Sequence, residues 1–208
     1  MRSGILALAV ASALLAFGAA SAEEARPVAF TSLADRVDAD RAWATIQSGP
    51  GCRAVKQVKW REQHLTFQTA NLRQIFASEV RNAHLSVAGG DSLFDADESP
   101  AEFQVAGAVV YARADFCGPD PGGYGRYSGS MSLDVEWQIY SVADRKVLAT
   151  IRTASSGSAQ ESSDSGNVRV LTLDGFTRNV RNLLADERFR DIVYGKKAPA
   201  GPAVAFFP

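Results

Sequence analysis

The feature that most constrains the fold is a strict alternation of apolar and polar residues between positions 131 and 140. The apolar positions of this segment are Met131, Leu133, Val135, Trp137 and Ile139. A period of two is typical of a β-strand that buries one face. The same alternation returns over residues 147–153 after a short polar segment, 141–145. The two segments therefore predict an antiparallel hairpin.

The expected register of this hairpin keeps both apolar sets on one face of the sheet. In that register Ile139 faces Val147. On the opposite face, Asp134 lies across from Arg152, which predicts a cross-strand ion pair worth about 0.2–1 kcal/mol.

Two further segments repeat apolar residues at helical spacing. They cover residues 68–83 and 170–186, and each predicts an amphipathic helix. Apolar runs at residues 28–33, 85–87 and 103–114 are expected strands, whereas the Ser- and Gly-rich residues 155–167 predict a flexible connection. A single sheet that packs against the apolar faces of both helices is the simplest arrangement that buries those faces. The expected fold class is α/β (α+β), a single mixed, mostly antiparallel sheet with a long hairpin and two amphipathic helices packed on one face.

The amino terminus is typical of a secretory signal peptide. A basic start precedes an apolar run over residues 5–17, and small residues at Ala20 and Ala22 predict cleavage after Ala22. The run is shorter than the roughly 20 residues that span a bilayer. We expect a signal peptide over residues 1–22, one α/β domain over 23–194 and a flexible tail over 195–208. The mature protein is expected in the periplasm or secreted, without membrane insertion.

Export bears directly on the two cysteines, Cys52 and Cys117. In an oxidising compartment they are expected to form a disulfide. Closing the loop between Cys52 and Cys117 would stabilise the fold by roughly 4 kcal/mol on the chain-entropy model. The alternative is a reactive thiol, although the chain has no C-x-x-C motif.

Charge and residue usage argue against several function classes. Lys and Arg number 22 against 23 Asp and Glu, which gives a net charge of −1 and argues against a nucleic-acid partner. The only histidines, His64 and His84, fall on different expected elements, so we expect no metal site and no cofactor.

Three segments suggest chemistry but lack part of what that chemistry requires. Residues 90–93 spell the Gly-Asp-Ser-Leu block of the GDSL esterases, yet no histidine follows Ser92 to act as its base. The acidic residues 91–98 could offer oxygen ligands to Ca²⁺, but the spacing departs from an EF-hand loop. Asp134 and Glu136 share one face of a strand, where paired carboxylates can hydrolyse glycosides. A solvated sheet face explains that pair better, and we expect no catalytic residue.

The loop over residues 118–129 has the composition of an interaction site. It combines several Gly and Pro residues with Tyr124, Arg126 and Tyr127. Tyrosine and arginine often anchor protein interfaces, and loops carry function more often than scaffolds do. These three residues are the candidate partner-binding positions, with a plain hairpin connection as the alternative.

The order of elements resembles the small α/β domain of bacterial envelope proteins. Most of the likeness lies in the segments 28–30, 85–87, "VAG" at 105–107 and "VEWQIYSVADRKVLAT" at 135–150. The group includes the TolB amino-terminal domain, the CsgG curli-secretion lipoprotein and the lipoprotein activators of penicillin-binding proteins. A looser likeness links the chain to an accessory amino-terminal domain of alphaproteobacterial trypsin-like proteases, with the protease domain absent. These resemblances imply a binding or scaffolding role and supply no catalytic residues.

The expected function is therefore that of an exported, soluble, non-enzymatic module that binds another cell-envelope protein. Its expected surfaces are exposed loops and an open sheet edge, which can accept a further strand. Two alternatives stay open, a hydrolase of unrecognised type and a small-ligand or Ca²⁺-binding module.

Overall fold

A computed structural model of the chain describes residues 24–48, 52–62, 69–88, 100–118, 127–162 and 167–195. Its strands are β1 (Val28–Asp35), β2 (Ala42–Ser48), β3 (Arg53–Lys59), β4 (Phe103–Gly118), β5 (Tyr127–Ser141) and β6 (Lys146–Ser162). Its helices are the short 3-10 turn η1 (Trp60–Glu62) and the α-helices α1 (Thr69–Asn82), α2 (Asn167–Ala185) and α3 (Glu187–Val193).

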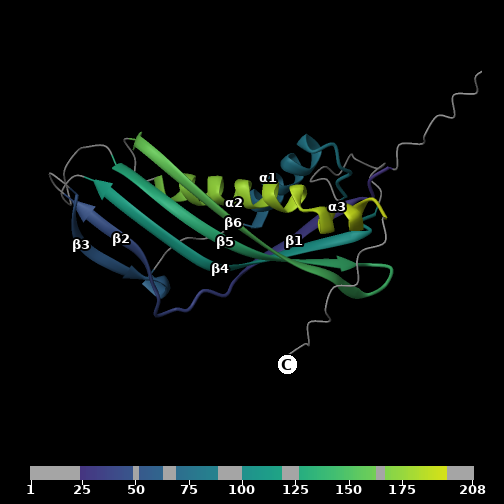
Figure 1. Cartoon of the computed structure of the whole chain (residues 1–208), viewed down its shortest axis with the longest axis horizontal. Coiled ribbons are helices and arrows are strands. Elements are labelled where there is room, and N and C mark those ends of the chain that lie inside the picture. The colour runs from purple at the N-terminus through teal and green to yellow at the C-terminus, as the bar shows by residue number, and fades with distance from the viewer. Residues whose placement is uncertain are drawn as a thin grey trace, which may run out of the picture.

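The strands form one six-stranded mixed sheet, in the order β3-β2-β4-β5-β6, with β1 also paired to β4. The β4–β5, β5–β6 and β2–β3 pairs are antiparallel, whereas β1 and β2 each run parallel to β4. Figure 1 shows the long strands β4, β5 and β6 side by side as the body of the molecule. The expected fold class is confirmed.

Strands β1 and β2 occupy the same edge of β4, one after the other. β1 pairs with β4 from Phe103 to Val109, and β2 pairs with it from Ala114 to Gly118. They follow one another along one side of β4, because β5 occupies the other side of β4 from Phe103 to Cys117. With 16 residues, β4 is long enough to pair with both β1 and β2.

The helices pack on one face of the sheet and enclose the core. Phe30 of β1 contacts Phe76 of α1 and Phe176 of α2, with ring centroids 5.4 and 5.9 Å apart. Trp137 of β5, fully buried, lies 5.8 Å from Phe176. The apolar residues that predicted the hairpin and the two helices are thus the residues that form the core.

A missing side chain makes room for the central tryptophan. Gly107 of β4 lies directly across from Trp137. A Cβ atom at Gly107 would lie 3.1 Å from the indole ring and 2.8 Å from Cδ1 of Leu33. The absence of a side chain at Gly107 therefore leaves room for both Leu33 of β1 and the Trp137 ring in the core.

The hairpin is confirmed, but its expected register is wrong by two residues. Ile139 faces Ala149 rather than Val147. One residue of the shift arises at the turn, where Ser141 faces Lys146, and one arises from a bulge at Leu148. Arg152 consequently lies across from Glu136 and reaches Asp134 diagonally, 2.8 Å from its Oδ2. The predicted ion pair forms, although not between directly opposed residues.

Other expectations from local sequence also need correction. The Ser- and Gly-rich stretch from Ser155 continues as strand β6 to Ser162, because it pairs with β5. Residues 85–87 contribute a single bridge, Val28 to Val87, rather than a strand. In the described part of the chain, no helix is long and apolar enough to cross a membrane.

Candidate functional site

The predicted disulfide between Cys52 and Cys117 is present. It closes a sequence separation of 65 residues, and the two Cα atoms are 5.5 Å apart. Cys117 is near the end of β4, and Cys52 directly precedes β3 in a left-handed conformation with φ of 50°. The bond ties the connection between β2 and β3 to the end of the central strand. A structural disulfide is typical of proteins outside the reducing cytosol.

Strand register gathers several chain connections around this disulfide. Ser48 at the end of β2 pairs with both Arg53 of β3 and Gly118 of β4. Tyr127 at the start of β5 pairs with Ser162 at the end of β6. The connections β2–β3, β4–β5 and β6–α2 therefore all leave the sheet from one end, which we call the disulfide end (Figure 1).

The predicted partner-binding loop belongs to this end. Tyr124 and Arg126 lie outside the described residues, and Tyr127 is the first residue of β5 rather than part of a loop. The β4–β5 connection is held at its base by Cys117 on one side and by the pairing of Tyr127 on the other. The binding role of these three residues stays a prediction.

The two ends of the described chain meet at the opposite end of the sheet. The backbone N–H of Arg26 donates over 3.0 Å to the carbonyl of Val193, the last residue of α3. The Arg26 guanidinium also donates to the carbonyl of Ile192 and lies 4.5 Å from the centroid of the Phe103 ring. Since Phe103 begins β4 and Cys117 nearly ends it, the disulfide end is remote from this junction.

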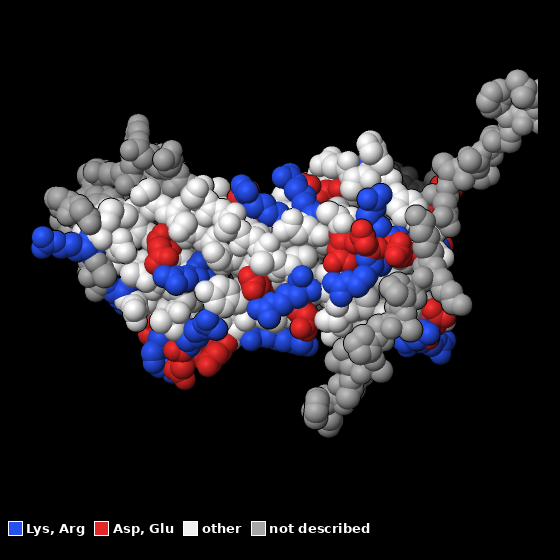
Figure 2. All heavy atoms as spheres, viewed as in Figure 1, with Lys and Arg blue, Asp and Glu red and all other residues white. Residues whose placement is uncertain are grey.

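The carboxylate pair singled out in the sequence is engaged by arginines. Asp134 Oδ2 lies 2.8 Å from Nη2 of Arg152, and Glu136 Oε1 lies 3.5 Å from Nη1 of Arg36. A guanidinium beside each carboxylate is the arrangement of a solvated, ion-paired sheet face, where such pairs add little stability. Figure 2 shows acidic and basic side chains interspersed, with neither sign gathered into a continuous patch on the face in view.

The other candidate chemical groups are mostly beyond the described residues. Ser92, the acidic segment 91–98 and His64 all fall there, so the hydrolase and Ca²⁺ alternatives stay predictions. His84 is exposed and follows α1 in a left-handed conformation, with φ of 58°. Among the residues that the structure describes, no group of three or more His, Cys, Asp or Glu could hold a metal ion.

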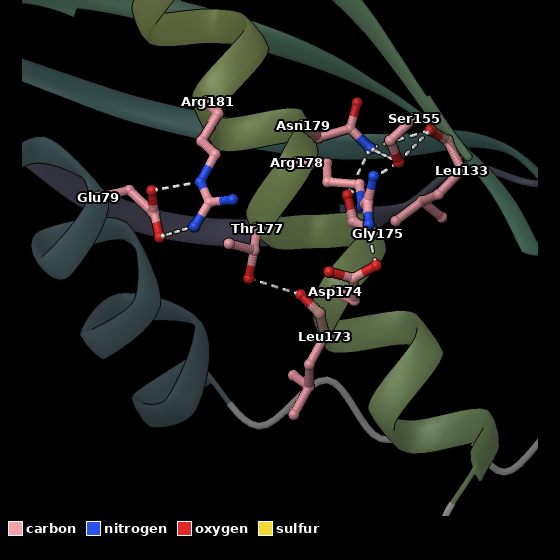
Figure 3. Close-up of polar contacts among 10 residues, drawn as sticks. All are labelled: Glu79, Leu133, Ser155, Leu173, Asp174, Gly175, Thr177, Arg178, Asn179 and Arg181. Atoms are coloured by element: carbon pink, nitrogen blue, oxygen red, sulfur yellow. Dashed lines mark hydrogen bonds and ion pairs between the residues drawn. The ribbon is translucent and has the colours of Figure 1, made fainter. Parts of the chain in front are cut away.

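A buried polar network that the sequence did not single out joins α2 to the sheet. Asn179 is fully buried, and its amide nitrogen donates to the carbonyls of Leu133 and Gly175 and to the Ser155 hydroxyl, over 2.7 to 3.0 Å (Figure 3). A polar residue between Phe176 and Val180 on the apolar stripe of a helix is the signal that could have revealed it. Because these groups satisfy one another, the network positions the helix rather than awaiting a ligand.

A second polar contact joins the two long helices. Arg181 of α2 donates from Nε and Nη2 to the two carboxylate oxygens of Glu79 on α1, over 2.7 and 3.0 Å (Figure 3). This side-chain hydrogen bonding and the carboxylate charge raise the pKa of Arg181. The two-pronged geometry fixes the angle between the helices more firmly than a single contact would.

Comparison with known proteins gives a structural likeness without a sequence family. No protein-family model matches the chain, and no curated protein matches it in sequence. A Xanthomonas campestris protein of the DUF330 family is similar at a TM-score of 0.42 and 13% identity, over 83% of this chain and 87% of that one. PelC from Paraburkholderia phytofirmans, solved as a dodecamer, is similar at 0.37 and 16% identity, over 79% and 89%. A minor lipoprotein from Acinetobacter baumannii is similar at 0.32 and 10% identity, over 79% and 94%.

Of these three solved structures, the one from Acinetobacter baumannii is described as a lipoprotein. Their identities and TM-scores describe a shared outline of the fold and carry no argument about function. The more specific resemblance to the TolB and CsgG group stays a prediction.

Proposed function

We propose that this protein is an exported, non-enzymatic module of the cell envelope, which binds another envelope protein through its disulfide end. The observation that carries the proposal is the convergence of three chain connections around the Cys52–Cys117 bond. Loops held at one end of a rigid sheet are a common way to build a binding surface. The connection between β4 and β5 also carries Tyr124 and Arg126, residue types that anchor interfaces.

The disulfide contributes to binding by limiting the freedom of these connections. Cys52 and Cys117 hold two of the three at a common base. Ordering a loop before the partner arrives lowers the entropy lost on association. The junction of Arg26 with Val193 lies at the other end of the sheet, so a tether at either terminus leaves the disulfide end accessible.

Export is supported by two independent observations. The first 22 residues have the three-part pattern of a signal peptide. The two cysteines, distant in sequence, are disulfide-bonded. A non-enzymatic role is supported by the state of Asp134 and Glu136, whose carboxylates are each held by an arginine.

Site-specific photocrosslinking in intact cells tests the proposal. A photoreactive residue in place of Arg53, exposed beside the disulfide, is expected to capture an envelope protein. The matched control is the same residue at Ala143, exposed in the β5–β6 turn at the other end of the sheet. The triple substitution Tyr124→Ala, Arg126→Ala and Tyr127→Ala should lower the yield at Arg53 about tenfold, as expected when interface anchors are lost. Equal capture at Arg53 and Ala143, or capture only at Ala143, contradicts the proposal.

A further inference from the structure

Strand β3 forms one border of the sheet, and its charges are of one sign. Among the described residues its strand neighbour is β2, so its outer edge carries no paired strand there (Figure 1). Its sequence, Arg-Ala-Val-Lys-Gln-Val-Lys, holds three cations and no carboxylate. One described side chain reaches the backbone of β3, where Oε2 of Glu62 accepts the N–H of Lys59 over 3.3 Å. That contact is at the far end of the strand from Arg53, beside the disulfide.

A bulge in β3 brings two of these cations to one face of the sheet. Arg53 lies across from Ser48, and Lys56 lies across from Ile46. In a regular strand, positions 53 and 56 would face opposite sides, because they are three residues apart. The register shift between these two pairs inserts one extra residue into β3 and so places both cations on the same face. The two β2 residues that they face are about 7 Å apart, the usual spacing of alternate strand residues.

This face of the sheet is open to solvent at the β2–β3 hairpin. Ile46 lies between Lys56 of β3 and Phe116 of β4. It is 42% exposed, whereas Ala44, two residues earlier on the same face, is 4% exposed. The core therefore ends between Ala44 and Ile46. Beyond it, the same face continues as an exposed surface of Ile46, Lys56 and Arg53, which we call the hairpin face.

The two cations of the hairpin face lack an acidic partner within the described residues. Arg53 and Lys56 are exposed, and neither forms an ion pair with another residue there. By contrast, Lys59 lies 3.4 Å from Oδ1 of Asp40. Charged side chains on an edge strand usually keep other strands away. Two cations on one face repel a basic strand but attract an acidic one, because charges directly across from each other interact.

We infer that β3 and the hairpin face receive an extended, acidic segment of the partner protein. This inference rests on the proposed function and names the chemistry of the partner that binds at the disulfide end. The segment adds to the outer edge of β3 as a strand, and its alternate carboxylates face Arg53 and Lys56. A peptide is favoured over an anionic lipid surface, because a peptide strand pairs with the backbone of β3 as well as with its charges.

Peptide titration followed by NMR tests the inference on the purified mature protein with its disulfide intact. The probe is a seven-residue peptide of alternating valine and glutamate, and the control peptide has lysine in place of glutamate. The glutamate peptide is expected to shift the backbone amide signals of β3, from Arg53 to Val58. Added salt should weaken this binding, because it screens exposed charges. Lys56→Glu should raise the dissociation constant of the glutamate peptide about tenfold.

Lys146→Glu is the matched control, because it makes the same charge change at an exposed lysine at the other end of the sheet. It should bind the glutamate peptide like the wild type, and thermal melting should show that both variants fold. Equal binding of the two peptides, or shifts at β6 in place of β3, overturns the inference. Binding of phosphatidylglycerol vesicles that Lys56→Glu abolishes, with no response to the glutamate peptide, overturns it in favour of a lipid surface.

Photocrosslinking at Arg53 separates this inference from the proposed function. Capture of an envelope protein at Arg53 without binding of the glutamate peptide overturns the acidic segment and leaves the proposed function standing. Binding of the glutamate peptide at β3 without capture at Arg53 contradicts the proposed function and supports the affinity of this edge for acidic strands.

Discussion

Thr153 of β6 donates its hydroxyl hydrogen to Oδ1 of Asn179 on α2 over 2.6 Å. The same hydroxyl accepts the indole N–H of Trp137 over 2.8 Å. A chain of buried polar groups thus runs from the central tryptophan to the helix above it. The amide nitrogen of Asn179 extends this chain to the carbonyls of Leu133 and Gly175. The position of α2 over β5 and β6 therefore depends on hydrogen bonds as well as on apolar packing.

Asn179→Ala is expected to lower the free energy of unfolding by about 1–3 kcal/mol, because it leaves buried groups without their hydrogen bonds. Urea denaturation measures the loss. Asn182→Ala is the control. Asn182 is exposed, and the one side-chain hydrogen bond described for it is the one that it donates to the carbonyl of Ala154. The control should cost less than about 1 kcal/mol. Similar losses in the two variants would show that the buried network does not stabilise the fold.

Gly107→Ala is expected to destabilise the protein by about 1–3 kcal/mol through overpacking. The added methyl group meets Leu33 at 2.8 Å and the Trp137 ring at 3.1 Å. Gly175→Ala is the matched control within α2, where a Cβ meets its nearest atom, the Ser155 hydroxyl, at 3.5 Å. That change should be neutral or stabilising by up to about 1 kcal/mol, because alanine favours helices. Thermal melting of both variants distinguishes the two effects, and a Gly107→Ala protein as stable as the wild type contradicts the packing argument.

Removing the disulfide is expected to weaken the fold without changing its core. The double variant Cys52→Ala and Cys117→Ala should lose up to about 4 kcal/mol of unfolding free energy on the chain-entropy model. Circular dichroism should stay that of the wild type, because the aromatic core around Trp137 and Phe176 does not include the bond. Mass spectrometry of exported, alkylated wild-type protein provides the direct check. Two alkylated thiols would refute the bond and weaken the case for export.

Asp186 should make stability depend on acid pH. Its carboxylate caps α3 by accepting the backbone N–H of Arg188 over 2.9 Å. The side-chain hydrogen bond from Arg188 lowers the pKa of Asp186, against the opposing effect of burial. A lowered pKa in the folded state contributes stability that is complete above the ordinary Asp pKa of about 3.9. That contribution is lost as pH falls through the lower folded-state pKa.

The variant Asp186→Asn keeps a capping side chain but removes the charge. Its stability deficit against the wild type should therefore be largest near neutral pH and should disappear in strong acid. Urea denaturation between pH 2 and pH 7 measures the difference. Glu187→Gln, the same charge change one residue along, is the control for net charge. If both variants show the same pH dependence, the specific contact with Arg188 is not its cause.

The hairpin shows where pattern reasoning holds and where it stops. Alternation predicted both strands and the buried face of β5, because burial on one face of a strand requires a period of two. It did not predict the bulge at Leu148, because the apolar residues Val147, Leu148 and Ala149 follow one another and fit either face. The offset between the two strands was decided by the turn and the bulge together.

The candidate site shows the same division. Residue types and export predicted the bond between Cys52 and Cys117, because an oxidising compartment pairs lone cysteines. The gathering of three connections around it follows from strand register, a long-range property that no local segment contains. The burial of Asn179 likewise depends on which sheet atoms lie beneath it.

By itself, the sequence determined the class of fold and the buried faces of β5 and α2, because the spacing of apolar residues indicates which face of a strand or helix is buried. It also predicted the disulfide, because the two cysteines of an exported chain are expected to pair. The tertiary structure alone decided that β1 and β2 share one edge of β4 and that Ser155 to Ser162 form a strand. It also decided that β6 is the last strand of the sheet among the described residues. These outcomes depend on backbone hydrogen bonds between residues far apart in the chain. Because nearly every residue offers the same backbone N–H and C=O groups, the residue types do not indicate which segments will pair.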